Sequence, residues 1–162
     1  PPRSTLFPYT TLFRSVGMPG HFLIRPTIEE MAVYVDPFNQ GEVLFAPDCQ
    51  AIFHRLYGTN AAWNLAYLTP INAKSLLARL LTNLKLIYLN RRDLRHTLTI
   101  LDYLLLLSPN QPSNSRDRGL VHYQLQNLLA ARSDLETYLA HNPEAPDRDQ
   151  ISQLLDNITD SL

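Results

Sequence analysis

Hydrophobic and polar positions follow one pattern up to about residue 70 and another pattern after it. In the first part, short segments alternate between apolar and polar side chains, which is typical of strands. From residue 72 onward, apolar side chains recur every three or four residues, as on the inner face of an amphipathic helix. We therefore predict a mostly α protein of the α+β class, in which a small antiparallel sheet is followed by antiparallel helix pairs.

Residues 20–25 and 32–36 are the alternating segments that predict a β-hairpin. Antiparallel pairing about a turn midway between them sets His21 opposite Asp36. The other predicted pairs are Phe22–Val35, Leu23–Tyr34 and Ile24–Val33. The imidazole and the carboxylate then share one face, and the other face is apolar. This apolar face would consist of Phe22, Ile24, Val33 and Val35.

His21 and Asp36 are the candidate catalytic residues. A carboxylate beside an imidazole fixes the tautomer of the ring and stabilises its charged form, as base and orienter do in nucleophilic catalysis. Residues 16–20 offer no nucleophile, so the pair would be half of such a site. The alternative is a buried polar pair that only satisfies its own hydrogen bonds, since buried polar groups need partners.

The first fifteen residues lack the pattern of the segment that follows. They contain two copies of a Thr-Leu-Phe unit, and a common sequencing-library adapter translates to this run codon by codon. Such a leader is left out of fold reasoning. We expect residues 1–15 to lie outside the fold and the natural chain to be truncated at its N-terminus. The alternative is a genuine strand-rich N-terminus.

Shorter elements are predicted after the hairpin. Residues 42–45 form a third strand, and Asp48 is the expected N-cap of a helix over residues 49–57 that ends at Gly58. A second helix is predicted over residues 60–68.

Long helices follow. Asn72 and Asp93 are the expected N-caps of the first two, and the first helix would run to about Asn90. Its apolar residues lie on one stripe, the pattern of a helix face that packs on a core. This stripe consists of Leu76, Leu77, Leu80, Leu84, Ile87 and Tyr88. Three further helices are predicted over residues 115–126, 127–140 and 147–159. In the last one, the aspartates Asp147, Asp149, Asp156 and Asp160 are expected to face outward.

A period of 34 residues relates two parts of this helical region. Pro109 and Pro143 are 34 residues apart, and the same shift superposes Leu94 on Leu128, Leu101 on Leu135 and Leu105 on Leu139. This period is typical of tetratricopeptide repeats, which predicts two units over residues 76–109 and 110–143 and a closing helix after them. Stacking would supply the core that each unit lacks alone. The alternative is a generic helical bundle.

Composition narrows the classes of function. The chain has 14 basic residues, two of which are arginines of the leader. The other 12 face 15 acidic residues, so the rest of the chain is mildly acidic. A dedicated nucleic-acid binder normally has a basic footprint, so no nucleic-acid partner is predicted. No apolar run approaches the ~20 residues that a membrane span needs. One cysteine, Cys49, excludes an internal disulfide and indicates a reducing compartment, which we take to be the cytoplasm.

The other chemistry-bearing residues give weaker signals. Cys49 follows an expected N-cap, where a helix dipole can lower a thiol pKa, although free cysteines are more often small buried hydrophobes. No metal or cofactor is predicted, because the remaining histidines lack metal-ligand spacing; they are His54, His96, His122 and His141. A basic cluster could meet an acidic partner or be a solvated helix face; it consists of Lys85, Arg91, Arg92 and Arg95. An aromatic group could anchor the helices or stack on a ligand; it consists of Tyr57, Trp63 and Tyr67.

Four motifs occur in an order that resembles a bacterial family. They are GMPGHFLIR at 17–25, VDPFNQG at 35–41, LLTNLKLIYLNRRD at 80–93 and RDRGL at 116–120. Together they resemble the SirB-type family, in which a transglutaminase-like domain is followed by tetratricopeptide-like helices. The resemblance covers everything after Ser15. It implies that residues 16–70 are the C-terminal remnant of the transglutaminase-like domain and residues 71–162 the repeats.

The resemblance also implies that His21 and Asp36 occupy the His and Asp positions of a transglutaminase or cysteine-protease-like core. The nucleophilic cysteine would then lie in a missing N-terminal lobe. Two functions stay open. The chain as given could be a non-catalytic protein-interaction or regulatory module that binds a protein or peptide partner. Alternatively, the full-length protein could be a thiol acyltransferase or peptidase that uses both residues.

Overall fold

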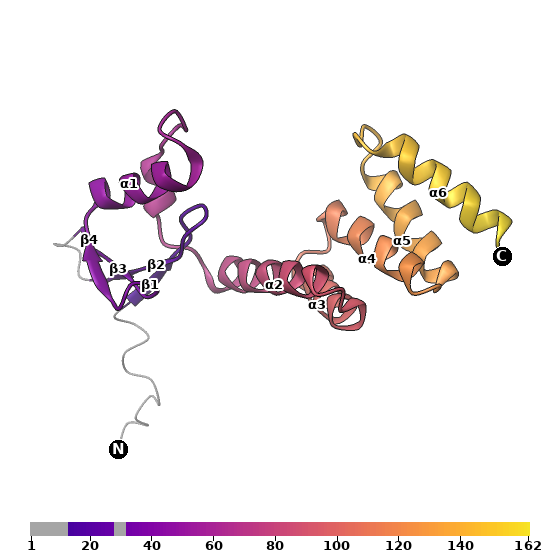
Figure 1. Ribbon diagram of the computed structural model, residues 1–162, viewed down its shortest axis with the longest axis horizontal. Coiled ribbons are helices and arrows are strands. Elements are labelled where there is room, and N and C mark those ends of the chain that lie inside the picture. Colours follow the sequence, from indigo (N-terminus) through magenta and orange to yellow (C-terminus); the bar gives the residue numbers. More distant parts are fainter. Residues whose placement is uncertain (1–12, 28–31) are drawn as a thin grey trace, which may run out of the picture. The chain divides into compact units, whose positions relative to one another are not determined.

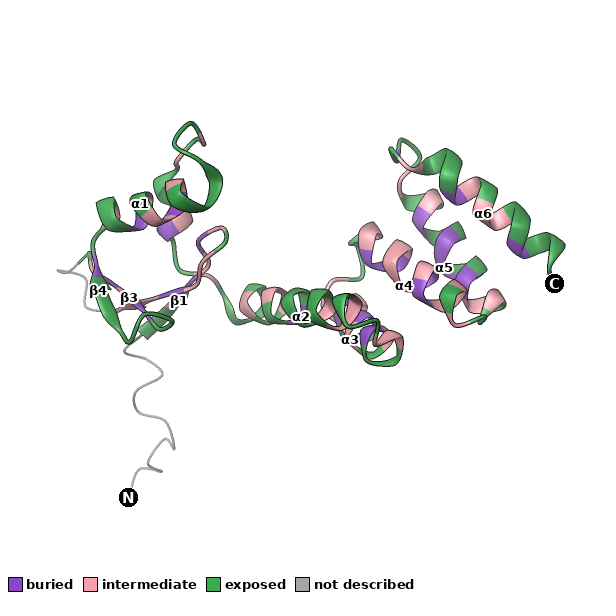
Figure 2. Ribbon diagram, in the orientation of Figure 1, coloured by how far each residue is buried: buried purple, intermediate pink, exposed green. Residues whose placement is uncertain are grey.

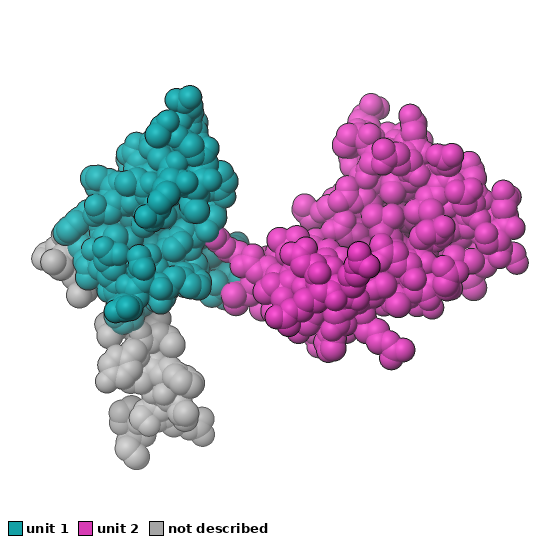
Figure 3. Space-filling view, in the orientation of Figure 1, with its two compact units in different colours: residues 1–76 teal, residues 77–162 magenta. Residues whose placement is uncertain are grey.

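The computed structural model describes residues 13–27 and 32–162 and divides into two compact units, Pro1–Leu76 and Leu77–Leu162 (Figure 3). The boundary between the units falls inside the first long helix, whereas the predicted domain boundary lies just before this helix. None of the helices in the described ranges is long and apolar enough to cross a membrane.

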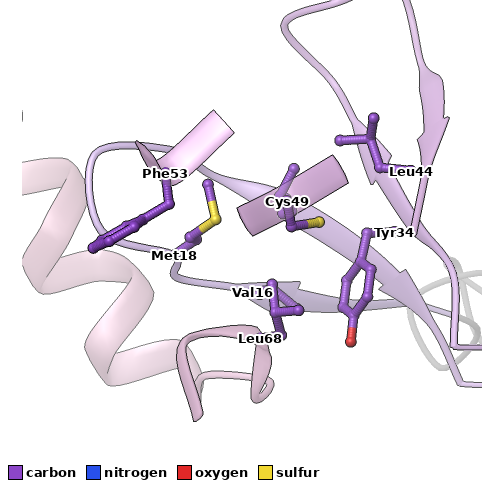
Figure 4. Packing of buried hydrophobic residues seen from close by; sticks show 8 residues of the cluster. Val16, Met18, Tyr34, Leu44, Cys49, Phe53 and Leu68 are labelled. Carbon is purple, nitrogen blue, oxygen red and sulfur yellow. The ribbon is translucent and has the colours of Figure 1, made fainter. Parts of the chain in front are cut away.

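Unit 1 is a four-stranded antiparallel sheet with a helix on one face (Figure 1). In sheet order, its strands are β1 (Phe13–Val16), β2 (Leu23–Pro26), β3 (Tyr34–Asp36) and β4 (Glu42–Leu44). Helix α1 (Ala46–Tyr57) and the short 3-10 helix η1 (Leu65–Leu68) complete the core. The core residues, seen in Figure 4, include Val16, Met18, Tyr34, Leu44, Cys49, Phe53 and Leu68.

Strand β1 begins before the expected start of the fold. Ser15 pairs with Ile24 of β2, and the Ser15 carbonyl accepts a hydrogen bond from the Ile71 N–H at 2.7 Å. The expectation that residues 1–15 lie outside the fold therefore fails for residues 13–15. The physical reason is that strand pairing uses backbone N–H and C=O groups, which any sequence supplies. Residues 1–12 lie outside the described residues, so the origin of the leader stays a prediction.

The register of the central hairpin differs from the predicted one by two residues. Ile24 pairs with Val35, where Val33 was expected. Because side chains alternate with a period of two, this shift leaves each residue on its predicted face. The buried face is the one that carries His21 and Asp36: Leu23 and Asp36 are buried, and Leu23 packs in the core with Cys49 and Phe53 of α1. The predicted apolar face is only half-buried in the structure; it consists of Phe22, Ile24, Val33 and Val35.

Helix α1 starts at Ala46, earlier than predicted. Its N-cap is Phe45, and the Asp48 carboxylate accepts a hydrogen bond from the Phe45 N–H at 2.8 Å. Asp48 is thus the carboxylate partner of a capping box and not the N-cap itself. Gly58 ends the helix as predicted, with φ of 91°, a conformation that glycine adopts without strain. Of the second predicted helix, only η1 forms, because the Asn64 side chain caps the chain there by accepting from the Ala66 N–H.

The remaining helices pack in antiparallel pairs, as predicted. They are α2 (Ala73–Asn90), α3 (Leu94–Leu107), α4 (Pro112–Gln124), α5 (Leu128–His141) and α6 (Arg148–Asp160). Both predicted N-caps are confirmed: Asn72 accepts from the Ser75 N–H at 2.8 Å, and Asp93 accepts from the His96 N–H at 3.2 Å. Within unit 2, α3 packs on α4, α4 on α5, and α5 on α6.

Candidate functional site

The loop before β2 positions His21. The His21 N–H donates to the Met18 carbonyl at 3.1 Å, which closes a tight turn with Pro19 and Gly20 at its centre. Gly20 has φ of 70°, as the third residue of a type II turn requires. A Cβ on Gly20 would lie 2.9 Å from the Tyr57 hydroxyl of α1, so Tyr57 would have to move, and the positive φ would strain any other residue. The Pro-Gly sequence therefore sets the direction in which His21 leaves the turn.

The turn after β3 orients Asp36. Its Oδ1 accepts a hydrogen bond from the Phe38 N–H at 2.9 Å, and its carbonyl accepts from the Gly41 N–H at 3.0 Å. An aspartate that binds the backbone two residues further on is a common turn former. Gly41 supplies the positive φ of 80° that the chain needs to enter β4. One carboxylate oxygen is thus held by the backbone, and the other is left for a side chain.

His21 and Asp36 meet, as the sequence predicted, although the hairpin register differs. The His21 Nε2 lies 2.8 Å from the Asp36 Oδ2. Asp36 is 1% exposed, while the imidazole is partly accessible and lies against the Phe38 ring, with centroids 5.7 Å apart. When Nε2 carries the proton that the carboxylate accepts, Nδ1 is the basic nitrogen. The pair can therefore orient a general base, and Nδ1 is the atom that would take a proton from a nucleophile.

Cys49 does not supply that nucleophile. Its side chain is fully buried in the core of unit 1, where it is labelled in Figure 4. Burial raises the pKa of the thiol to about 11, with further contributions from Asp48 and Asp36. The thiol is thus protonated at neutral pH, whereas the thiolate is the reactive form. Cys49 fits the alternative interpretation, a small buried hydrophobe.

The other predicted candidates have mostly structural contacts. The rings of Trp63 and Tyr67 each lie 5.4 Å from the Phe53 ring, so they belong to the aromatic part of the core. His96 is bound to the Asp93 carboxylate at 2.7 Å. Over residues 13–27 and 32–162, no three His, Cys, Asp or Glu side chains come together as a metal site would need.

A network of polar contacts links four helices of unit 2, and the sequence pattern did not reveal it. Asp117 binds Lys85 at 2.7 Å and Arg116 at 3.0 Å, and Arg116 also reaches Asp147 at 3.1 Å. Asp147 further accepts a hydrogen bond from the Tyr138 hydroxyl at 2.6 Å. This bond lowers the pKa of Asp147 and raises that of Tyr138. Two expectations are corrected: Asp147 does not face outward, and Lys85 is not part of a free basic cluster.

Two further residues of the RDRGL motif, Arg118 and Gly119, also contact neighbouring helices. Arg118 binds both oxygens of Asp134 at 2.8 and 2.7 Å and also contacts Asp102 at 2.8 Å. These contacts, chiefly the one to Asp134, raise the pKa of Arg118. Gly119 lies against α5, because a Cβ there would be 2.8 Å from the Leu135 Cγ. The sequence feature that could have indicated these contacts is the spacing of Asp102 and Asp134, which lie 16 residues before and after Arg118.

The apolar stripe of α2 forms a second candidate site. It was expected to pack on a core, yet Figure 2 shows most of α2 as exposed or intermediate. Leu81 is the only buried residue of this helix. The exposed fractions are 47% for Leu77, 52% for Leu80, 39% for Leu84 and 45% for Ile87. We call these four residues the α2 stripe. A groove of about 460 Å³ lies beside it, lined by Leu77, Leu81, Tyr103, Leu106 and Leu107.

Comparison with known protein families divides the chain near the boundary between the two units. Residues 12–82 match the model of the transglutaminase-like superfamily. Residues 84–156 match the tetratricopeptide repeat model. The first match contains His21, Asp36 and the stripe residues Leu77 and Leu80. The second contains Leu84, Ile87 and the RDRGL motif.

The chain is also similar to several bacterial proteins. It is 34% identical over 139 residues to a UPF0162 protein of Xylella fastidiosa (strain 9a5c), which covers 84% of this chain and 50% of that protein. It is 31% identical over 134 residues to a UPF0162 protein of Vibrio cholerae, covering 81% and 48%. Over 80 residues it is 31% identical to Protein SirB1 of Salmonella typhimurium, covering 49% and 30%. The chain spans about half the length or less of these curated relatives. No solved structure matches it significantly.

Proposed function

Because the chain belongs to the bacterial UPF0162/SirB1 family, in which a transglutaminase-like core is followed by tetratricopeptide repeats, we propose that it acts as a protein-binding module. Its repeats would hold a segment of a partner protein, since stacked helix pairs form extended surfaces. The cytoplasm is the compartment that we propose, since the one cysteine is an unpaired thiol.

The exposed α2 stripe is the observation that carries this proposal. Inside the described parts of the chain, every buried polar side-chain atom has a hydrogen-bond partner. The same fold nevertheless leaves the four large apolar side chains of the α2 stripe accessible to water. Covering such a side chain completely is worth about 1.5–3 kcal/mol, and contiguous apolar patches mark interaction sites.

Site-specific cross-linking in cells tests this function. A photo-reactive amino acid would replace Leu84 in the stripe, and, as the control, Leu129 on α5, which is 72% exposed. We expect a protein that cross-links at position 84 but not at 129, and that binds the purified chain at least ten times more weakly after Leu84→Asp. Equal cross-linking at both positions, or unchanged affinity, would contradict the proposal.

The geometry around His21 favours a second function for the whole protein. We also propose that longer family members catalyse acyl transfer or peptide hydrolysis with a cysteine thiolate. That cysteine would start a helix in the part of the relatives that this chain does not match. Its thiol proton would pass to the His21 Nδ1 and then to the leaving amine, while Asp36 holds the ring through Nε2. The observation that supports this is the 2.8 Å contact to a buried, backbone-oriented carboxylate.

A thiol-reactive amide probe on the full-length protein tests the second function. We expect labelling that His21→Ala abolishes and that Cys49→Ala leaves unchanged, since Cys49 is buried and protonated. Labelling that survives His21→Ala, or that Cys49→Ala removes, would refute it. If a serine, proline or asparagine occupies the position of the upstream cysteine, the catalytic function is ruled out and only the binding function remains.

A further inference from the structure

We propose that the α2 stripe and the groove beside it bind an acidic amphipathic helix of a partner protein. This inference rests on the binding function proposed above and names the class of partner. It is carried by the shape of the groove, the spacing of the stripe and the charge of the surrounding residues.

The stripe has the spacing that a helix would match. Its residues follow one another at intervals of three, four and three positions, so they lie on one side of α2. From Leu77 to Ile87 the stripe is about 15 Å long at ~1.5 Å per residue. That is about three turns of a partner helix with apolar side chains every three or four residues, which is a recurring mode of peptide recognition.

The groove beside the stripe gives the site a hollow into which partner side chains can insert. It lies between the N-terminal half of α2 and the C-terminal half of α3, and its walls are leucines and one tyrosine. Leu106 stands at the edge and is 78% exposed, the highest value among the exposed large apolar side chains of the described chain. Tyr103 is 54% exposed. A ridge of apolar side chains on a partner helix would cover both residues and fill the hollow between them.

The charges around the stripe favour a partner helix that carries negative charge. From residue 73 to residue 95 there are six basic residues and one acidic residue; the basic ones are Lys74, Arg79, Lys85, Arg91, Arg92 and Arg95. Asp117 neutralises Lys85, and the single acid, Asp93, is bound to His96. Arg91, Arg92 and Arg95 are exposed at the C-terminal end of the stripe. Complementary charge steers association and rejects partners of like charge.

Two other occupants fit less well. A second copy docking its own α2 on this stripe would bring two basic segments together, which costs free energy. An anionic membrane would suit the charge and the leucines. A flat bilayer surface, however, would leave the hollow between α2 and α3 unfilled. The groove therefore favours a helix over both alternatives.

The test uses the full chain and an 18-residue synthetic peptide that has leucines at helical positions a and d and glutamates elsewhere. Binding is measured by fluorescence anisotropy. A control peptide carries lysine in place of each glutamate, and anionic phosphatidylglycerol vesicles form a third arm. Protein variants are Leu80→Asp and Leu106→Asp, with Leu129→Asp as the matched control on α5.

We expect the acidic peptide to bind, the lysine peptide to bind at least ten times more weakly, and both stripe or groove variants to weaken binding at least tenfold. Leu129→Asp should leave the affinity unchanged, and raising the salt concentration should weaken it. Binding to vesicles without binding to the peptide, dimerisation that Leu106→Asp abolishes, or peptide binding unaffected by the variants would each overturn this inference. A cross-linked partner at position 84 that is not an acidic helix would overturn it while leaving the binding function intact.

Discussion

The two units of this protein hold their paired charges in different ways. In unit 1, the described residues contain one such pair, His21 and Asp36, which tight turns at the ends of two strands position. In unit 2, the paired charges lie on helices and connect one helix to the next through Arg116 and Arg118. A change to a turn should therefore move one site, whereas a change to an arginine should loosen the contacts among several helices.

Two spectroscopic probes can follow the units separately. Trp63 is the only tryptophan of the chain and lies in unit 1 against Phe53. The far-ultraviolet circular dichroism signal comes largely from the long helices α2 to α6. Tryptophan fluorescence therefore reports mainly on the sheet unit, and dichroism mainly on the helical unit.

Arg118→Ala should have the largest effect. It leaves the nearly buried carboxylate of Asp134 without its bidentate partner, and breaking such a pair costs about 3 kcal/mol or more. We expect denaturant unfolding followed by dichroism to shift strongly, with little change in the tryptophan transition. In the control, Arg118→Met with Asp134→Leu should recover much of the loss. Equal shifts of both probes would argue against separate units.

Gly119→Val should come next. Its Cβ would lie 2.8 Å from the Leu135 Cγ and 3.2 Å from the Ala131 carbonyl oxygen, and overpacking of this kind costs about 1–3 kcal/mol. Thermal unfolding measured by dichroism should show a lower midpoint. The control is Gly58→Ala in unit 1, followed by tryptophan fluorescence, where a Cβ meets nothing within 4 Å but φ is 91°. A smaller loss for Gly119→Val than for Gly58→Ala would contradict the close packing of α4 on α5.

Gly20→Ala tests the turn in unit 1. Positive φ alone disfavours the new residue by about 1 kcal/mol, and its Cβ would press on Tyr57 and Leu56 of α1. We expect a loss of about 1–2 kcal/mol in the tryptophan-monitored transition and an altered NMR signal of the His21 ring, with the dichroism transition unchanged. An unaltered His21 signal would show that the turn does not position the imidazole.

Asp147→Asn should have the smallest effect, and a pH-dependent one. The Tyr138 hydroxyl and Arg116 lower the pKa of Asp147 in the folded protein. A carboxyl group with a lowered pKa contributes stability above its unfolded pKa and loses it as the pH falls through the folded value. We expect the variant to be about 1 kcal/mol less stable at pH 7, with the difference shrinking as the pH falls below the ordinary pKa of an aspartate, about 4. A difference that is independent of pH would contradict the ionic role of Asp147.

Much of this fold could be predicted from local sequence, because the relevant interactions join residues close together in the chain. The caps at Asn72 and Asp93 and the helix end at Gly58 each depend on contacts within three or four residues. The pairing of His21 with Asp36 was also predicted, since strand alternation groups them on one face whether or not the register shifts by two. The helical region likewise follows from its periodicity.

Contacts between distant segments decided the rest. Hydrophobic spacing on α2 marks an apolar stripe, but it does not say whether another helix covers it, and in the structure only Leu81 is buried. The sheet face that is buried depends on where α1 packs, so the face with Asp36 became the inner one. The role of RDRGL depends on Asp102, Asp134 and Asp147, whose side chains meet the motif only once the helices stack. Sequence thus determined most of the elements and the candidate pair, whereas strand β1, burial and long-range ion pairing came from packing, which no local pattern encodes.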